Sequence, residues 1–293
     1  MEYSKKKKLI IGTAQFGSSY GISNTNGRVR LEEIKKIFEI SHDHGVSKID
    51  TAVRYGVAEN NIGKLNLRNF DFISKITFEE NNIEVNKWAY NETKKILARI
   101  SQKSLYALLL HEPNVMLKNL GQDIYNSLLN LKTKKLVKKI GLSANNMDDI
   151  LPIIDKYHFD VVQIPLNVFD RRAIDSGIIK YLKNKNIEVH VRSIFLQGLL
   201  LMTKKDRSQK FSSWKNHFYK WDTWLKNNKI SRLQACLQFI YSIDDIDYIV
   251  IGVQNITELN EIFNQTFDVE KLSFNDLSVT DLNLIDPSKW KSL

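Results

Sequence analysis

The chain of 293 residues contains a single cysteine, Cys236, so it can form no internal disulfide and no cysteine-rich metal site. It has only 4 prolines and 12 glycines, which argues against a disordered or fibrous protein. No stretch approaches the roughly 18 uninterrupted apolar residues that a membrane helix needs. These scarcities predict a globular protein of the reducing cytoplasm that crosses no membrane.

Positive charge is in excess, with 43 Lys and Arg against 33 Asp and Glu, for a net charge of +10. Such an excess favours anionic partners, from nucleic acid to phosphorylated metabolites. Here it consists mostly of lysines scattered among asparagine and isoleucine, without a basic stripe interleaved with aromatic residues. We therefore expect a solvated surface and no nucleic-acid partner; no pattern in the chain indicates an oligomeric state.

Short β-rich runs alternate with longer helical patterns along the whole chain. The segment LEEIKKIFEISHDHG is typical, because its apolar residues have helical spacing and lie near one face: Leu31, Ile34, Ile37, Phe38 and Ile40. Strands are predicted at residues 7–12, 47–51, 70–76, 105–110, 138–142, 160–164, 187–192 and 248–251. Eight βα units without a linker rich in proline or glycine favour one α/β domain over residues 1–293, a (β/α)8 TIM barrel, over two doubly wound halves.

Two segments depart from this alternation. Residues 195–224 are too many and too polar for a simple turn, and they include Phe211, Trp214 and Phe218. We expect them to form an elaborated loop over the mouth of the barrel. The tail, from about residue 272 to 293, contains several leucines and predicts a further helix packed outside the barrel.

Four side chains with related chemistry follow the second, third and fourth predicted strands. They are Asp50 and Tyr55 in DTAVRYG, Lys75 in FISKI and His111 in LLLHEP. Each one alone has an ordinary structural explanation, such as a helix cap, a turn aromatic or a solvated lysine. Because barrel enzymes keep their chemistry at the carboxyl ends of the strands, we expect the four to converge there.

An acid, a phenol, an amine and an imidazole together suit carbonyl reduction. Hydride delivered to a carbonyl carbon leaves an alkoxide that must be protonated, and a tyrosine with a pKa of about 10 is a poor acid unless a cation stabilises its phenolate. Lys75 would supply that cation and Asp50 would hold Lys75 in place. Neutral His111 would orient the carbonyl oxygen with a hydrogen bond, and Tyr55 would donate the proton.

The chain resembles the aldo-keto reductases. The segments GTAQFG, DTAVRYGVAENNIG, LLLHEP, IGLSANN, VVQIP and IGVQNITELNEI, with Lys75 after the third strand, match that family in order over residues 7–265. The resemblance implies a small-molecule carbonyl substrate and a nicotinamide cofactor bound in extended form without a Rossmann domain. The absence of a GxGxxG run after a strand agrees with this. The implied cofactor is NADP(H), with NAD(H) as the alternative.

The resemblance also implies which residues bind the cofactor: Gly12, Thr13, Asp50, Ser143, Asn145, Gln163, Arg192, Ser193, Gly252, Gln254, Asn255 and Glu258. Ser143 and Gln163 match the groups that hold the nicotinamide carboxamide. The Asn that usually follows this serine is Ala144 here, which leaves open whether Asn145 replaces it. Arg192 stands where an aromatic residue often stacks under the nicotinamide, so it either stacks or points at a phosphate.

The adenosine-phosphate end is implied at GVQNITELNEI, where a helix begins. Free N–H groups at a helix start favour a phosphate. Members of the family that prefer the 2′-phosphate usually place Ser, Lys, Arg or Gln there, whereas this chain has Gln254, Asn255 and Glu258. Glu258 would repel a 2′-phosphate if it pointed inward.

Arginines at strand ends indicate the substrate class. Arg54 precedes Tyr55, Arg171 and Arg172 follow the sixth strand, and Arg192 ends the seventh. An apolar aldehyde could not compensate their desolvation, whereas a phosphorylated, nucleotide-linked or acidic keto-sugar could. The segments FLQGLLL and HEP also resemble a bacterial branch associated with surface-sugar pathways, which implies carbohydrate metabolism. Alternatively, Arg171 and Arg172 face solvent and cap a helix.

Two other functions remain open at this point. One is a nicotinamide-binding barrel with a regulatory role, and the other is an isomerase or lyase that uses bound cofactor transiently. The spacing of His42 and His44 could suit a metal, but they end a predicted helix beside Asp43 and are expected to be solvated. No metal is therefore expected.

Overall fold

The computed structural model describes residues 1–79, 84–266 and 272–292. Eight parallel strands close into one barrel in chain order, and β8 pairs with β1. The strands are β1 Leu9–Gly12, β2 Lys48–Asp50, β3 Asp71–Ile76, β4 Leu105–Leu110, β5 Val137–Ser143, β6 Val161–Pro165, β7 Glu188–Arg192 and β8 Tyr248–Gly252. Every predicted strand is present, with ends shifted by at most two residues. The prediction of a single (β/α)8 barrel is confirmed.

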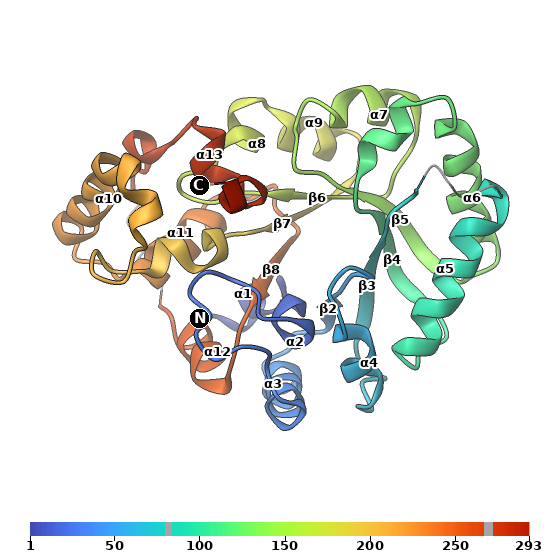
Figure 1. The fold of residues 1–293 in the computed structure, drawn as a ribbon, viewed down its shortest axis with the longest axis horizontal. Coiled ribbons are helices and arrows are strands. Elements are labelled where there is room, and N and C mark those ends of the chain that lie inside the picture. The colour runs from blue at the N-terminus through green and yellow to red at the C-terminus, as the bar shows by residue number, and fades with distance from the viewer. Residues whose placement is uncertain (80–83, 267–271, 293) are drawn as a thin grey trace.

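Helices surround the barrel (Figure 1). The α-helices are α1 Tyr3–Lys6, α2 Ala14–Gly17, α3 Leu31–Asp43, α4 Ala58–Gly63, α5 Val85–Arg99, α6 Gly121–Thr133, α7 Ile150–Lys156, α8 Arg172–Asp175, α9 Ile178–Asn184, α10 Lys215–Asn227, α11 Arg232–Tyr241, α12 Ile256–Phe263 and α13 Leu282–Ile285. Short 3-10 helices are η1 Pro113–Leu117, η2 Leu196–Leu201, η3 Gln209–Trp214, η4 Asn275–Leu277 and η5 Pro287–Ser292. None of the helices in the described part of the chain is long and apolar enough to cross a membrane.

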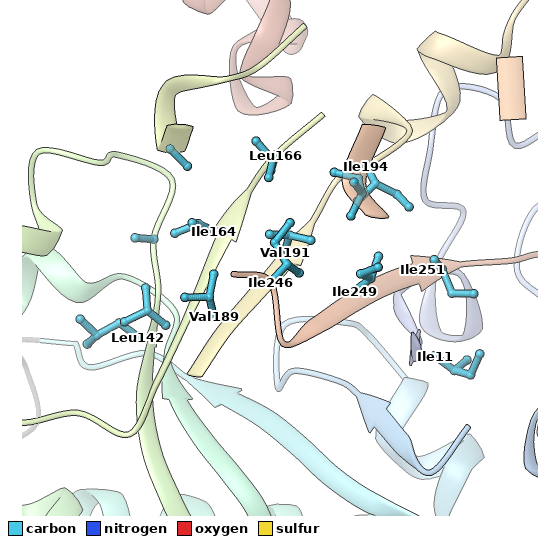
Figure 2. Packing of buried hydrophobic residues seen from close by; sticks show 14 of the residues in the cluster. Ile11, Leu142, Ile164, Leu166, Val189, Val191, Ile194, Ile246, Ile249 and Ile251 are labelled. Atoms are coloured by element: carbon cyan, nitrogen blue, oxygen red, sulfur yellow. The ribbon is translucent and has the colours of Figure 1, made fainter. Parts of the chain in front are cut away.

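Side chains alternate across the barrel wall, as the pleat of a strand requires. In β1, Leu9 and Ile11 belong to the large cluster between strands and helices, whereas Ile10 belongs to a small cluster inside the barrel. The other buried members of the inner cluster are Ile73, Ala107, Leu109 and Val161. Figure 2 shows part of the large cluster, with Ile164, Val189, Val191, Ile249 and Ile251 labelled. The barrel interior is a packed core and not a channel.

The apolar face predicted around residues 31–40 is present in α3, with one shift. Ile34, Ile37 and Phe38 are buried, but the next buried residue is Ser41 and not Ile40. Leu31, the first residue of the helix, is exposed. Spacing of three and four residues places position 41 on the inner face after positions 34, 37 and 38. Ser41 is therefore buried because of its position along the helix, although Ile40 is the more apolar residue.

The segment 195–224 contains η2, η3 and most of α10. Phe211, Trp214 and Phe218 are all buried, and the buried residues of α10 continue with Trp221 and Leu225. These positions recur at intervals of three and four residues, so a helical signal was present in a segment interpreted as a loop. The aromatic side chains anchor the segment to the molecule.

The tail packs on that same segment. The Trp214 indole donates to Asp281 Oδ2 over 2.8 Å, and the rings of Phe211 and Trp290 lie 5.0 Å apart in an edge-on arrangement. Trp290 also donates to the Leu284 carbonyl over 3.0 Å, which closes the tail on itself. Residues after 285 thereby reach the mouth of the barrel, where they line a cavity.

Candidate active site

A cavity of about 790 Å³ opens where the strands end. Its lining includes the last residues of β1, β2, β7 and β8, namely Gly12, Asp50, Arg192 and Gly252. The size lies within the range of small-molecule and cofactor sites. This end of a barrel is where the βα loops build catalytic centres, so the cavity is the candidate site.

A buried ion pair lies at one end of the cavity. Lys75 Nζ donates to Asp50 Oδ1 over 2.5 Å and to the Thr51 carbonyl over 3.0 Å. The side-chain amide of Gln163 donates to the other Asp50 oxygen over 2.8 Å. The side chains of Lys75 and Asp50 are at most 2% exposed, so each charge depends on these partners for stabilisation. The ammonium group is therefore held in one position.

Tyr55 lies close to that ammonium and to His111. Lys75 Nζ is 5.2 Å from the centroid of the Tyr55 ring, and the centroids of the Tyr55 and His111 rings are 6.2 Å apart at 82°. The structure brings the four predicted side chains together from three different strand ends. Asp50, Tyr55 and His111 line the cavity, whereas Lys75 lies behind them.

Two glycines allow the backbone around Tyr55 to adopt this position. Gly56 has a φ of +57°, and a Cβ there would lie 2.6 Å from the Gly17 carbonyl oxygen. A Cβ on Gly17 would clash with the Tyr55 carbonyl oxygen. Helix α2 and the turn after β2 can therefore touch only because both positions lack a side chain.

His111 is uncharged at neutral pH. Burial lowers its pKa to about 3, and the positive charges of Lys75, Arg192 and Arg54 act in the same direction. Its Nδ1 is buried and has no hydrogen-bond partner among the described residues. A neutral imidazole in this position can donate a hydrogen bond through its one N–H, and it does not act as a proton donor at neutral pH.

Two further buried polar atoms have unused hydrogen-bonding capacity. Ser143 and Gln163 are paired in register on β5 and β6, and neither Ser143 Oγ nor Gln163 Oε1 has a partner in the described part of the chain. Gln163 is bonded to Asp50, which lines the cavity. A primary carboxamide, with N–H donors and a carbonyl acceptor, fits a hydroxyl and an amide oxygen placed in this way.

Most of the residues assigned to the cofactor by resemblance line the cavity: Gly12, Thr13, Asp50, Asn145, Arg192, Ser193, Gly252, Gln254 and Glu258. Ser143, Gln163 and Asn255 are outside that lining. Asn255 instead caps α12, since its side chain accepts the N–H of Glu258 over 2.9 Å.

Arg192 makes a local network at the rim of the cavity. It donates to Asn145 Oδ1 over 2.5 Å, to the Ala144 carbonyl over 3.3 Å and to Ser193 Oγ over 3.3 Å. The Asn145 oxygen is thus engaged by Arg192, and the two loops after β5 and β7 are joined across the rim.

Arg54 and Arg171 do not line the cavity. Arg54 forms an ion pair with Glu112, and about half of each side chain is exposed. Arg171 is buried: it donates to the Val168 carbonyl over 3.2 Å and to the Phe274 carbonyl. It therefore faces neither the cavity nor, as the alternative expected, the solvent; it joins the loop after β6 to the tail.

The motif glutamate in DTAVRYGVAE is also structural. Glu59 is 3% exposed, accepts a hydrogen bond from Ser74 Oγ over 2.8 Å and pairs with Arg99 Nε at 2.6 Å. These bonds join α4 to β3 and α5. They hold the base of the turn that presents Tyr55.

One wall of the cavity contains none of the residues predicted from the sequence. Tyr20 and Ser23 from the loop after α2 face Gln197 and Gly198 in this lining. Ile22 N–H donates to the Gln197 carbonyl over 3.2 Å, and a Cβ on Gly198 would clash with Ser23 Oγ. The glycine in FLQGLLL was the available signal, because its φ of +92° permits this close approach.

The profile of the Aldo/keto reductase family matches residues 8–279 of the chain. The chain therefore belongs to the aldo-keto reductase family, and it is an NAD(P)H-dependent oxidoreductase of that type. A search of curated proteins found no match. Carbonyl reduction of a small molecule is the chemistry of this family, and the resemblance drawn from the motifs is confirmed.

Solved structures show the same fold at low identity. The aldo-keto reductase AKR11C1 from Bacillus halodurans, in its holo form, is 15% identical with a TM-score of 0.72, covering 92% of this chain and 89% of that one. A thermostable aldo-keto reductase, Tm1743, in complex with the inhibitor epalrestat is 19% identical with a TM-score of 0.68, covering 92% of both chains. A putative aldo-keto reductase from Pseudomonas aeruginosa is 18% identical with a TM-score of 0.64, covering 87% of both. No group of three or more His, Cys, Asp or Glu that could hold a metal ion occurs in the described residues.

Proposed function

We propose that this protein reduces an aldehyde or ketone to an alcohol, with Tyr55 as the proton donor. One observation carries the proposal: a fixed, buried ammonium group and a neutral imidazole both lie close to a tyrosine that lines the cavity. A nicotinamide held in this cavity would supply the hydride for the carbonyl carbon. The carbonyl oxygen takes the proton from the Tyr55 hydroxyl.

Each of the surrounding side chains has a separate role in this reaction. Lys75 stabilises negative charge on the tyrosine oxygen as the proton leaves. Asp50 and the Thr51 carbonyl hold the ammonium, and Gln163 holds Asp50. His111 donates a hydrogen bond to the carbonyl oxygen and remains neutral, because its pKa of about 3 lies well below neutrality.

The buried oxygens of Ser143 and Gln163 support a nicotinamide at this end of the cavity. The Ser143 hydroxyl would donate to the carboxamide oxygen, and Gln163 Oε1 would accept one of its N–H groups. These bonds would give partners to two buried atoms that have none. They would also orient the ring relative to Asp50, which Gln163 already contacts.

The substrate class that the cavity supports best is a hydroxylated keto-sugar, with a phosphate or carboxylate as its anionic group. Tyr20, Ser23, Asn145, Gln197 and Arg192 line the cavity that holds Tyr55 and His111. An apolar aldehyde would desolvate these groups without replacing their hydrogen bonds. Arg192 can bind an oxyanion in bidentate fashion, and the proposal places the reaction in carbohydrate metabolism.

The reaction is tested by following the absorbance of NADH and NADPH with a panel of aldehydes, ketoses and keto-sugar nucleotides. We expect the oxidised cofactor and the alcohol to form in equal amounts. If the cofactor bound but no carbonyl compound caused its net consumption, the proposed reductase activity would be wrong. A regulatory role or an isomerase activity would then be the better assignment.

The substrate class is tested by Arg192→Ala, with Arg54→Ala as a control outside the cavity. Loss of the guanidinium of Arg192 should raise KM for an anionic sugar by about tenfold or more, as expected for a lost charge-assisted hydrogen bond, and change KM for a neutral aldehyde little. Arg54→Ala should leave both nearly unchanged. Cofactor binding is measured in parallel, and an equal response of both substrates to Arg192→Ala would contradict the anionic class.

A further inference from the structure

The start of α12, which lines the same cavity as Tyr55, is occupied by the protein's own acceptors. Gln254 N–H donates to Glu258 Oε2 over 2.8 Å, and Ile256 N–H donates to Glu33 Oε1 over 2.7 Å. The Glu258 N–H donates to Asn255 Oδ1 over 2.9 Å. A helix start usually offers such N–H groups to a phosphate. Here two carboxylates and an amide oxygen already bind them.

The charges at this end of the cavity also disfavour additional negative charge. Glu258 and Glu261 of α12 both belong to the lining, and the charge of Glu261 acts on Glu258. The cations in the lining of the whole cavity are Arg192, Arg232 and Lys291. Arg232 is already paired with Asp222, at 2.7 Å. A phosphate monoester would add about two negative charges beside these two carboxylates.

The length of a dinucleotide connects this end to the chemistry. If the nicotinamide lies beside Tyr55, the adenosine half must extend along the cavity away from it, and the cavity continues to Gln254 and Glu258. A ribose 2′-hydroxyl can donate a hydrogen bond to a carboxylate. A 2′-phosphate is chiefly an acceptor and is repelled by one.

We propose that this protein binds NAD(H) in preference to NADP(H), and that Glu258 is the residue that determines the preference. The inference rests on the proposed function, since it takes the nicotinamide to lie at Tyr55. It reverses the NADP(H) preference that the family resemblance implied. Burial and the nearby charge of Glu261 raise the pKa of Glu258, and the N–H donated by Gln254 opposes them only in part.

The test is a binding measurement that does not depend on turnover. Fluorescence titration or calorimetry of the full chain gives Kd for NADH and NADPH. We expect NADH to bind about tenfold more tightly or better, which corresponds to about 1.4 kcal/mol. Glu258→Gln keeps an oxygen that can accept the Gln254 N–H, and it should tighten NADPH binding by about tenfold while weakening NADH binding by a smaller factor.

Glu33→Gln is the matched control. Glu33 bonds the same helix start through Ile256 but does not line the cavity. This variant should leave the ratio of the two Kd values within about twofold of that of the unmodified chain, even if its Tm falls. Tm measured for both variants separates loss of folding from loss of selectivity.

The outcomes are distinct. Equal or tighter binding of NADPH by the unmodified chain would overturn the inference and leave the reductase proposal standing. An equal change of selectivity in Glu33→Gln and Glu258→Gln would also overturn it, because the helix start and not the Glu258 side chain would then decide. Binding of neither nucleotide would overturn the proposed function together with the inference.

Discussion

The two ends of this barrel hold the same four kinds of side chain and differ in what those side chains contact. The carboxyl end combines Asp50, Lys75, Tyr55 and His111. The amino end combines Glu188, Lys139, Tyr106 and His190. At the amino end the phenol is bound directly by the carboxylate, because Tyr106 Oη donates to Glu188 Oε1 over 2.7 Å. At the carboxyl end the carboxylate binds the ammonium and an amide, and the phenol lines a cavity.

The partners of each group therefore decide whether these residue types can do chemistry. Burial and the charge of Glu188 raise the pKa of Tyr106, which makes it a worse acid than free tyrosine. Burial alone would raise the pKa of Glu188, but its contacts with His190, Tyr106 and Lys139 outweigh burial and lower that pKa to about 2. His190 Nε2 lies 3.5 Å from Glu188 Oε2, which is longer than a good hydrogen bond. None of the four lines the cavity described above.

The largest contrast is expected between the two tyrosines. Tyr55→Phe should lower kcat by about 10²- to 10⁴-fold, as loss of a proton donor does, and leave cofactor Kd and Tm nearly unchanged. Tyr106→Phe should leave kcat within about twofold and lower stability by about 1 kcal/mol, because Glu188 loses a donor. Steady-state kinetics and thermal unfolding of both variants measure this contrast. Retained turnover in Tyr55→Phe would remove the role assigned to it.

Lys75→Met should affect both activity and stability. Turnover should fall by about 10²-fold or more, and stability by about 3–5 kcal/mol, because Asp50 is left as a buried charge without its ion-pair partner. The double variant Lys75→Met with Asp50→Asn should regain much of the stability in urea unfolding without regaining turnover. If turnover returned in the double variant, Lys75 would be needed only for folding.

His111→Ala should lower kcat/KM by about 10²-fold through loss of a hydrogen-bond donor to the carbonyl oxygen. Because the His111 pKa of about 3 keeps the imidazole neutral, the ratio of wild-type to variant rate should not change between about pH 5 and 8. His111→Gln, which retains a donor, should recover part of the loss. A ratio that varied with pH across this range would show that a charged His111 acts in the reaction.

The smallest effect on activity is expected at the amino end. The folded-state pKa of Glu188 is lowered from 4.5 to about 2, so its contribution to stability is present above about pH 4.5 and is lost as the pH falls toward 2. Glu188→Gln should therefore cost roughly 2–3 kcal/mol in urea unfolding at neutral pH, and less as the pH is lowered. kcat at pH 7 should stay within about twofold. A large loss of turnover would mean that the two ends of the barrel are coupled.

Much of the barrel and the candidate quartet follows from local patterns. Strand β4 and its neighbours are short apolar runs followed by polar residues, and a parallel sheet brings such ends to one edge whatever the details of packing. The segment containing Phe211 predicts a loop, because its polar residues outweigh an aromatic stripe with helical spacing. The wall made by Tyr20 and Gln197 had no local signal beyond a glycine, since the two residues meet only when distant loops fold together.

The sequence alone determined the eight βα units, the family and the positions of Asp50, Tyr55, Lys75 and His111, because each depends on periodicity or on a motif within one strand end. The tertiary structure decided which charges face the cavity. Two arginines that the sequence places at strand ends, as candidates to bind an anionic substrate, differ in the fold. The side chain of Arg192 lines the cavity, whereas that of Arg171 lies buried against the backbone near the tail. The same holds for Glu258, whose orientation depends on the start of α12. Side-chain direction and partners across the chain are set by packing, and packing depends on contacts between residues far apart in sequence.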